Sequence, residues 1–454
     1  MIKVTRDDIY SGNWINIAEE AWKRGQKELV QVDISHPQND KSAQVAIESV
    51  ISGVGTYNKG NNVFVALGPG GCDFAIQLCQ YLEAKGLSTK MIIDMRQAPK
   101  ECAILAMHIK NDADKELITN NYLNEVKWLA NENQTGNWIT IRNPNEHEPS
   151  SEENDLIVKH HELQNALHTY TTEMMSKKKI ISAEVIAVPT ENEAAKFGLG
   201  FDEFRNIYYE ALSVSPEEII ATIKKLSFYP TVLTASREGK NIRVTDEHGT
   251  DLVINLKGRA LIADVGKIGN ISLDGTPAFE SVVTNHYSGE CFTAPVENTA
   301  SGVICARIPL ITTFGTIDNY DIAFENGKAV LETTFKDKKG ETRHVKTHAK
   351  IGNNALLELT GLSEKGYTGN KLTAHRNCGN IAELGICPVN PVIAKKLSTI
   401  GKTTGNALID EKLRLHIATG YNDYIGGQTP ASVGGFKTSH TDFLLGLNYN
   451  IEFE

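Results

Sequence analysis

The chain lacks the apolar stretches that membrane insertion or secretion requires. Its longest apolar run, GVICARIPLITTF, is interrupted by Arg307 and is too short to span a bilayer. The N-terminal segment MIKVTRDDIY contains no apolar signal core. The 7 cysteines are scattered, odd in number and form no CxxC pair, which suits buried thiols in a reducing compartment. We therefore expect a cytoplasmic protein without a membrane partner.

Basic charge is also scarce. The 46 Lys and Arg residues are outnumbered by 56 Asp and Glu residues, so the net charge is −10. No basic stretch is interleaved with aromatic residues, and we therefore expect no nucleic-acid partner. The mild acidity mostly reflects solubility, and it is also compatible with cationic ligands such as free amino termini.

Several common catalytic motifs are missing. The absence of HExxH excludes the usual zincin site, and no GxSxG elbow accompanies Ser439 and His440. Cys378 and Cys387 carry potential ligand atoms, but their spacing fits no zinc ribbon.

The length of 454 residues exceeds what one core normally serves, so we expect two domains. In the first third, strand-like residues 61–68 and 89–94 flank the helix-like residues 73–86, a pattern typical of a parallel sheet. The acidic, Pro-containing stretch 143–155 is the best linker candidate. We predict an α/β N-terminal domain over residues 1–180.

The remaining residues, 181–454, predict a mixed α+β, β-rich catalytic domain. Capping boxes begin at Thr190 and Ser215, and residues 201–212 carry a helical apolar stripe. From residue 231 onward the pattern is typical of β structure, including an alternating strand over 250–259 and a hairpin turn at 326–327.

Five side chains with metal-binding chemistry stand in four short segments of this second part, punctuated by glycine and proline. They are Glu290, Glu383, His416, His440 and Asp442. Three carboxylates and two imidazoles suit Zn²⁺, Mn²⁺ or Co²⁺, and two adjacent ions can share a carboxylate. The segments predict a metallohydrolase if they converge.

Each residue alone has an ordinary structural explanation. Glu290 and Glu383 are flanked by apolar residues, where burial is costly without a cation. A surface loop explains Glu290 equally well, whereas a strand edge facing water is the weaker explanation for Glu383. A lone histidine such as His416 on an apolar strand is usually structural. His440 and Asp442 are two apart, so both face the same way on a strand.

These segments together resemble the aminopeptidase S and aminopeptidase T group of thermophilic-type metallo-aminopeptidases, metallopeptidase family twenty-nine. The likeness covers roughly residues 180–454 in order. It runs through ISAEVIAVPTENEAAKFGLGFDEFRNIYYEA, TDLVINLKGR, GECFTAPVE, NIAELGICPVNP, GNALIDEKLRLHIATG and SHTDF.

The resemblance implies two divalent metal ions (Zn, Co or Mn) held at the positions of the five side chains. It implies hydrolysis of N-terminal amino acids from peptides by a metal-activated water, and a homodimer. It also implies a tyrosine beyond His416, for which Tyr421 and Tyr424 are both available. We take Tyr424 as the catalytic candidate, with Glu383 or Glu290 as the carboxylate that transfers the proton.

Two alternatives remain open from the sequence. A mononuclear Fe(II) ring-cleaving dioxygenase of the dihydroxypyridine type would use one histidine and the terminal H-x-D pair. Retention of both glutamates favours hydrolysis. A non-catalytic peptide-binding relative is the other alternative, and the complete ligand set argues against it.

Overall fold

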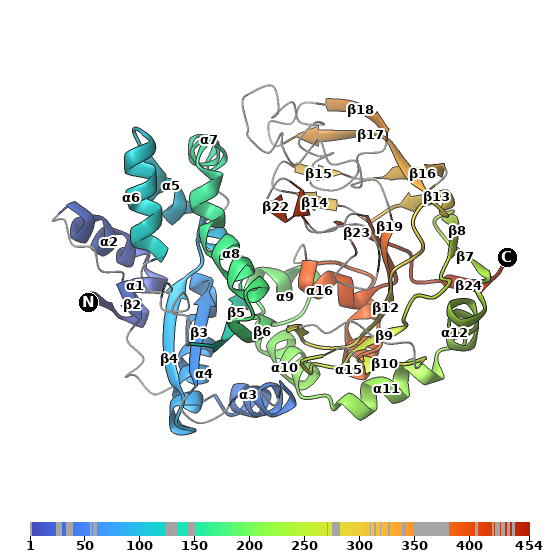
Figure 1. Ribbon diagram of the computed structural model, residues 1–454, viewed down its shortest axis with the longest axis horizontal. Helices are drawn as coiled ribbons and strands as arrows, with labels where there is room; N and C mark the ends of the chain where they lie inside the picture. Colours follow the sequence, from blue (N-terminus) through green and yellow to red (C-terminus); the bar gives the residue numbers. More distant parts are fainter. Residues whose placement is uncertain are drawn as a thin grey trace.

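The structure is a computed structural model of the whole chain. It describes residues 2–23, 30–32, 40–54, 57, 61–123, 127, 134–143, 150–269, 271–274, 282–308, 310–312, 315–317, 319–325, 327–337, 342–348, 381–404, 407–419, 422, 427, 432–433, 436–437 and 441–454. In Figure 1 the N-terminal part of the chain and the β-rich C-terminal part lie side by side.

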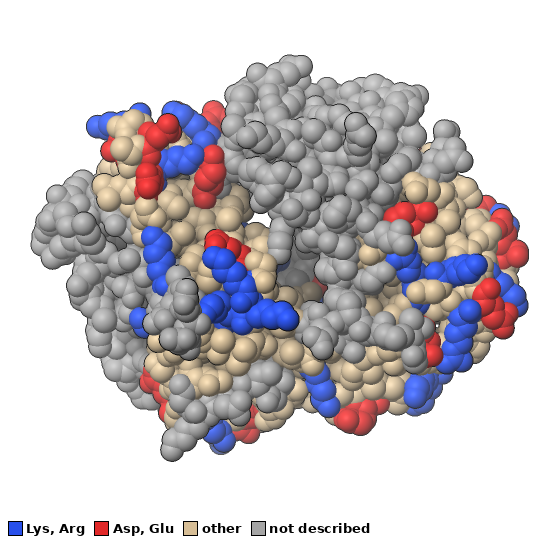
Figure 2. All heavy atoms as spheres, in the orientation of Figure 1, with Lys and Arg blue, Asp and Glu red and all other residues tan. Residues whose placement is uncertain are grey.

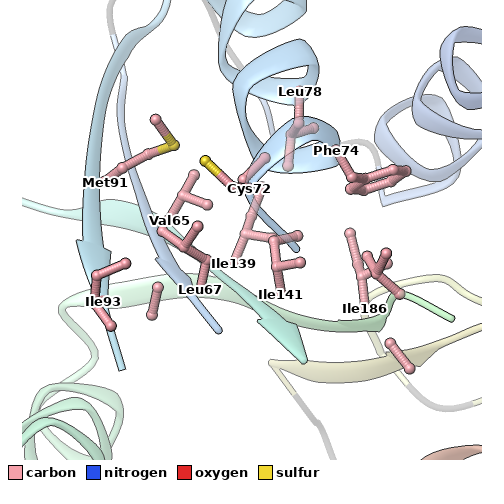
Figure 3. Close-up of a cluster of buried hydrophobic side chains, with 14 of the residues drawn as sticks. Val65, Leu67, Cys72, Phe74, Leu78, Met91, Ile93, Ile139, Ile141 and Ile186 are labelled. Atoms are coloured by element: carbon pink, nitrogen blue, oxygen red, sulfur yellow. The ribbon is translucent and has the colours of Figure 1, made fainter. Parts of the chain in front are cut away.

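A five-stranded parallel sheet forms the centre of the N-terminal half. Its strands in spatial order are β11 (Val283–His286), β6 (Ile180–Ala187), β5 (Gly136–Arg142), β3 (Asn62–Leu67) and β4 (Ser88–Ile93). The expected strand, helix and second strand are confirmed as β3, α4 (Cys72–Ala84) and the parallel neighbour β4. Figure 3 shows apolar side chains of α4 packed on those of the sheet. The near-continuous burial of β3 is typical of a parallel strand covered on both faces.

Helices surround this sheet (Figure 1). They include α3 (Lys41–Val54), α5 (Pro99–Met107), α6 (Asp112–Leu123), α7 (Ser151–Lys159), α8 (His161–Ser176), α9 (Glu191–Phe197) and α10 (Phe201–Leu212). A small parallel pair, β1 (Ile2–Val4) and β2 (Val30–Val32), lies beside α1 (Arg6–Tyr10) and α2 (Asn13–Lys23). Both expected capping boxes are confirmed, at α9 and at α11 (Pro216–Lys225).

Two antiparallel sheets make up most of the C-terminal half, which confirms its β-rich character. The nine-stranded sheet contains β14 (Leu310–Thr312), β15 (Gly315–Ile317), β17 (Lys328–Asp337), β16 (Tyr320–Glu325), β13 (Ser301–Ala306), β8 (Asp251–Asn255), β7 (Asn241–Asp246), β24 (Tyr449–Phe453) and β18 (Thr342–His348). Strands β16 and β17 pair from Glu325 and Lys328 outward, so the expected hairpin is present, although Asn326 lies outside the described residues.

The second sheet has six strands and contains four of the five predicted metal-binding residues. Its spatial order is β10 (Ile271–Ser272), β9 (Ile262–Asp264), β12 (Glu290–Thr293), β19 (Ile381–Ile386), β20 (His416–Thr419) and β23 (Thr441–Leu444). Side chains of one face, among them Cys291, Leu384 and Ile417, join the C-terminal hydrophobic core. The other face therefore holds the residues that alternate with them.

One expectation about this half is wrong. Residues 229–238 form helix α12 (Tyr229–Glu238), and β structure begins only at Asn241. Pro230 stands in the first turn, where its missing N–H costs nothing, and Gly239 ends the helix in the left-handed conformation with φ 74°. These two signals outweigh the β-branched residues between them.

The two halves are joined by buried polar contacts. The Asn390 amide, just before α15 (Pro391–Lys396), donates to the carbonyls of Ala211 and Ser288, each at 3.0 Å. The Tyr208 hydroxyl donates to the carbonyl of His286 at 3.0 Å. Figure 2 shows a hollow near the centre of the face in view, where the two halves meet.

The expected domain boundary between residues 180 and 181 stays a prediction. The parallel sheet of the N-terminal half includes β6 and β11, which reach beyond that position.

Other expectations concern segments rather than the sheets. Residues 144–149 of the expected linker lie outside the described residues, while Ser150 and Glu153 form the capping box that begins α7. Six cysteines are free thiols: Cys72, Cys79, Cys102, Cys291, Cys305 and Cys387. None of the helices described is both long and apolar enough to cross a membrane.

The buried Glu184 gives a pH-dependent prediction. Burial in β6 raises the pKa of Glu184 well above its usual value, and Tyr57 donates a hydrogen bond to it. A raised folded-state pKa costs nothing below the unfolded pKa of about 4.3, and the cost grows by about 1.4 kcal/mol per pH unit above it. We expect Glu184→Gln to raise the melting temperature at pH 8 and to change it little at pH 4.

Differential scanning calorimetry at both values of pH measures this. The exposed Glu203 on α10 provides the control, because Glu203→Gln should leave the melting temperature unchanged at either pH. An equal shift of the Glu184→Gln protein at pH 4 and pH 8 would contradict the explanation.

Candidate metal centre

The register of the six-stranded sheet brings distant residues onto one face. Gly385 in β19 pairs with Phe292 of β12 on one side and with His416 of β20 on the other. Glu383 pairs with Ala418, which pairs in turn with Asp442 of β23. Because cross-strand partners share a face and side chains alternate, Glu290, Glu383, His416 and Asp442 all belong to the face opposite the core.

His416 is the centre of the cluster. Its Nε2 atom lies 3.1 Å from Oε1 of Glu290 and 3.9 Å from Oε1 of Glu383, and all three residues are buried. The Nδ1 atom lies 3.2 Å from the carbonyl oxygen of Arg414, which can only accept. Nδ1 therefore carries the proton in that hydrogen bond, and Nε2 is the ring nitrogen that faces the carboxylates and would bind a metal in place of a proton. Metal-binding histidines are oriented in this way.

The residues present fit a cation in three respects. Glu290 Oε1 is buried and receives no hydrogen bond from the described residues, despite its approach to His416. A Cβ on Gly385 would lie 2.1 Å from His416 Nε2 and 2.7 Å from Glu290 Oε1, so only glycine lets both side chains take these positions. The donor set of a carboxylate and an imidazole is one that divalent zinc, cobalt and manganese accept.

Cys387 also belongs to this cluster. Its Sγ atom, a Glu290 oxygen and a His416 nitrogen lie within 4.8 Å of one another, and all three residues are buried. In the sequence, Cys387 is one of two cysteines with a potential ligand atom, and its spacing from Cys378 fits no zinc ribbon. Nothing in the sequence therefore connects Cys387 with His416. Its nearness to His416 depends on the pairing of β19 with β20, which sequence spacing does not reveal.

Lys412 is the cation already present. Its side chain is 1% exposed, and Nζ donates to Oδ2 of Asp264 at 2.9 Å and to Oε2 of Glu290 at 2.7 Å. Burial disfavours the ammonium, but the three carboxylates of Asp264, Glu290 and Glu411 outweigh it and raise the pKa of Lys412 well above its usual value. Lys412 therefore stays charged and fixes one oxygen of Glu290.

The carboxylates around Lys412 respond differently. Burial alone would raise the pKa of Glu290, but Lys412 and His416 hold it well below its usual value. Burial, with repulsion from Glu290 and Asp442, raises the pKa of Glu411 to about 8 despite the attraction of Lys412. Burial opposes a charge on His416, yet Glu290 and Glu383 raise its pKa well above the usual value. A divalent ion would take the place of the proton that these glutamates favour on His416.

The other predicted site residues fall in two groups. Asp442 lies close enough for its charge to act on His416 and Glu411. The remaining candidates, His440, Tyr421 and Tyr424, lie outside the described residues.

The donor set fits a divalent metal, and the comparisons with known proteins identify a family of metalloproteases. The family model described as thermophilic metalloprotease (M29) matches residues 36–349. The chain belongs to this family, and is thus a metallo-aminopeptidase, a hydrolase of peptide bonds. No curated protein sequence matches significantly. Nothing in the family match supports the dioxygenase alternative.

A solved structure shows the same fold. It is described as wild-type AmpT from Thermus thermophilus, is 16% identical, and superposes with a TM-score of 0.56. The similarity covers 90% of this chain and 94% of that chain. The expected arrangement, a parallel sheet with helices followed by a β-rich part, is thereby confirmed.

Gly385 supplies a prediction for the centre. We expect Gly385→Ala to weaken the binding of Zn²⁺ by about 10²-fold or more, because the added methyl group displaces His416 and Glu290 from each other. Isothermal titration calorimetry of protein freed of metal measures the affinity. Gly200→Ala is the matched control, since a Cβ at Gly200 meets nothing within 4 Å. Unchanged affinity in the Gly385→Ala protein would place the cation elsewhere.

Lys412 supplies a second prediction, which concerns the stability of the metal-free protein. Lys412→Met leaves Asp264 and Glu290 facing each other without an ammonium, and we expect a loss of about 3–5 kcal/mol in the free energy of unfolding without metal. Lys396, whose ion pair with Glu210 is exposed, is the control, and Lys396→Met should cost less than about 1 kcal/mol. Urea denaturation of the metal-free proteins measures both. Equal stability of the two variants would contradict the role given to Lys412.

Proposed function

We propose that the chain removes N-terminal amino acids from peptides at a centre of two divalent metal ions, zinc, cobalt or manganese, formed by Glu290, Glu383, His416, His440 and Asp442. The observation that carries the proposal is the position of His416 Nε2, between two buried glutamates and with Nδ1 held by a backbone carbonyl. A bound divalent ion would supply Lewis acidity, which polarises the scissile carbonyl and activates a water for attack.

The protein's own residues position the ligands, transfer the proton and stabilise the oxyanion. Lys412 and the Arg414 carbonyl hold Glu290 and His416 in place. Lys412 engages Oε2 of Glu290, and a bound cation would engage Oε1, so neither oxygen of Glu290 would remain to carry a proton. Glu383 is therefore the glutamate proposed to transfer the proton to the leaving amine, in addition to its role as a ligand. Tyr424 is proposed to stabilise the oxyanion.

The excess of carboxylates explains the preference for a free amino terminus. A protonated α-amine is a cation, and a buried site with more acids than bases attracts it. An acetylated peptide lacks this charge and should be a poor substrate. The homodimer, the cytoplasmic location and the lack of a nucleic-acid partner stay predictions from the sequence.

The test is hydrolysis of aminoacyl-p-nitroanilides and of short peptides. We expect a chelator to abolish turnover, Zn²⁺, Co²⁺ or Mn²⁺ to restore it, and acetylated peptides to resist cleavage. Glu383→Gln should lower kcat by about 10²–10⁴-fold, whereas the surface variant Glu203→Gln should match the wild type. Full activity without metal would refute the proposal. Oxygen uptake with a dihydroxypyridine, in place of hydrolysis, would favour the dioxygenase.

A further inference from the structure

Cys387 lies where a third ligand of the cation would stand. It directly follows β19, two residues beyond Gly385, and it is 0% exposed. Its Sγ atom lies within 4.8 Å of the ligand atoms that Glu290 and His416 offer. Those two residues belong to the site of the proposed function, so the inference below rests on it.

The contacts of Cys387 fix its backbone and leave its sulfur weakly engaged. The Tyr449 hydroxyl donates to the Cys387 carbonyl at 3.4 Å. The thiol itself makes a long contact of 3.8 Å to the carbonyl of Gly289, the residue before Glu290. A thiol is a weak donor, and little is lost when its sulfur binds a metal instead.

The distances suit a four-coordinate ion. Zinc bonds of about 2.0–2.3 Å to nitrogen, oxygen and sulfur place neighbouring ligand atoms of a tetrahedron about 3.2–3.8 Å apart. The nitrogen of His416 and the oxygen of Glu290 are already 3.1 Å apart. Sγ lies within 4.8 Å of the ligand atoms of both residues, so a shift on the order of 1 Å brings it into such a tetrahedron.

The second observation concerns one carboxylate oxygen of Glu290. Oε1 of Glu290 is buried and accepts no hydrogen bond from the residues that the structure describes. Gly385 lets His416 and this oxygen lie against its backbone, since a Cβ there would collide with both. The thiol, the imidazole and the carboxylate oxygen therefore converge from three segments of the described chain.

We propose that Cys387 is a ligand of the ion held by Glu290 and His416, and that its thiolate makes this position selective for zinc. Thiolate is a soft ligand that favours zinc over manganese or magnesium. The sulfur gives up its proton to solvent when the metal binds.

The test is the absorption spectrum of full-length protein freed of metal and titrated with Co²⁺. Bonding to a thiolate produces an intense near-ultraviolet charge-transfer band from sulfur to cobalt, while the visible bands report cobalt binding whatever the ligands. We expect the charge-transfer band in the wild type and its loss in Cys387→Ser, with the visible bands retained. Cys291→Ser is the matched control, because Cys291 is equally buried but belongs to the core on the other face of the sheet.

Metal competition gives an independent measure. Cys387→Ser should lower zinc affinity by at least about 10²-fold, more than the loss of an outer hydrogen bond to a ligand costs, and should change manganese affinity far less. The wild-type spectrum does not depend on any variant, so a variant that fails to fold does not spoil the test.

The outcomes separate this inference from the proposed function. Wild-type protein that binds cobalt without a charge-transfer band, or a band that persists in Cys387→Ser, overturns the role of Cys387 and leaves the hydrolase proposal standing. Wild-type protein that binds no cobalt or zinc at all overturns both.

Discussion

The buried ion pair between Lys412 and Glu290 is the contact on which the candidate centre depends. Without the ammonium, Glu290 and Asp264 would repel each other inside the protein, because each is largely removed from water. With it, one oxygen of Glu290 is held and the other is directed towards His416. The ion pair thus removes the repulsion between two buried carboxylates and holds Glu290 in the orientation of a metal ligand.

The six-stranded sheet separates stability from chemistry by the alternation of its side chains. Leu384, Ile386 and Ile417 face the hydrophobic core, while their neighbours Glu383, Gly385 and His416 face the site. The polar face therefore rests on packed strands rather than on loops. Since a one-residue slip of register would exchange the two faces, the core that stabilises this half also keeps the ligands in place.

Much of the fold and part of the site could be predicted from the sequence. Helix caps, the parallel β3–α4–β4 unit and the β-rich second half follow from local patterns. Glu290, Glu383 and His416 stand out as acids and a histidine within apolar segments. Lys412 and Gly385 do not, because their roles arise from strand pairing between distant segments. A lysine is rarely buried, so nothing local marks Lys412, and α12 shows that caps at the ends of a segment can outweigh its β-branched interior.

The permanent charge of Lys412 also bears on how the centre exists before a metal arrives. A site made of carboxylates alone would be strongly destabilising when empty, and metal binding would then be needed for folding. Here an ammonium offsets part of that charge from within, and the elevated pKa of Glu411 means that this acid holds a proton near neutral pH. These two features lower the cost of the metal-free state, so the fold can form first and the ion can bind to ligands already in position. The binding free energy of the ion is then not reduced by the free energy needed to order the chain, so the affinity is higher.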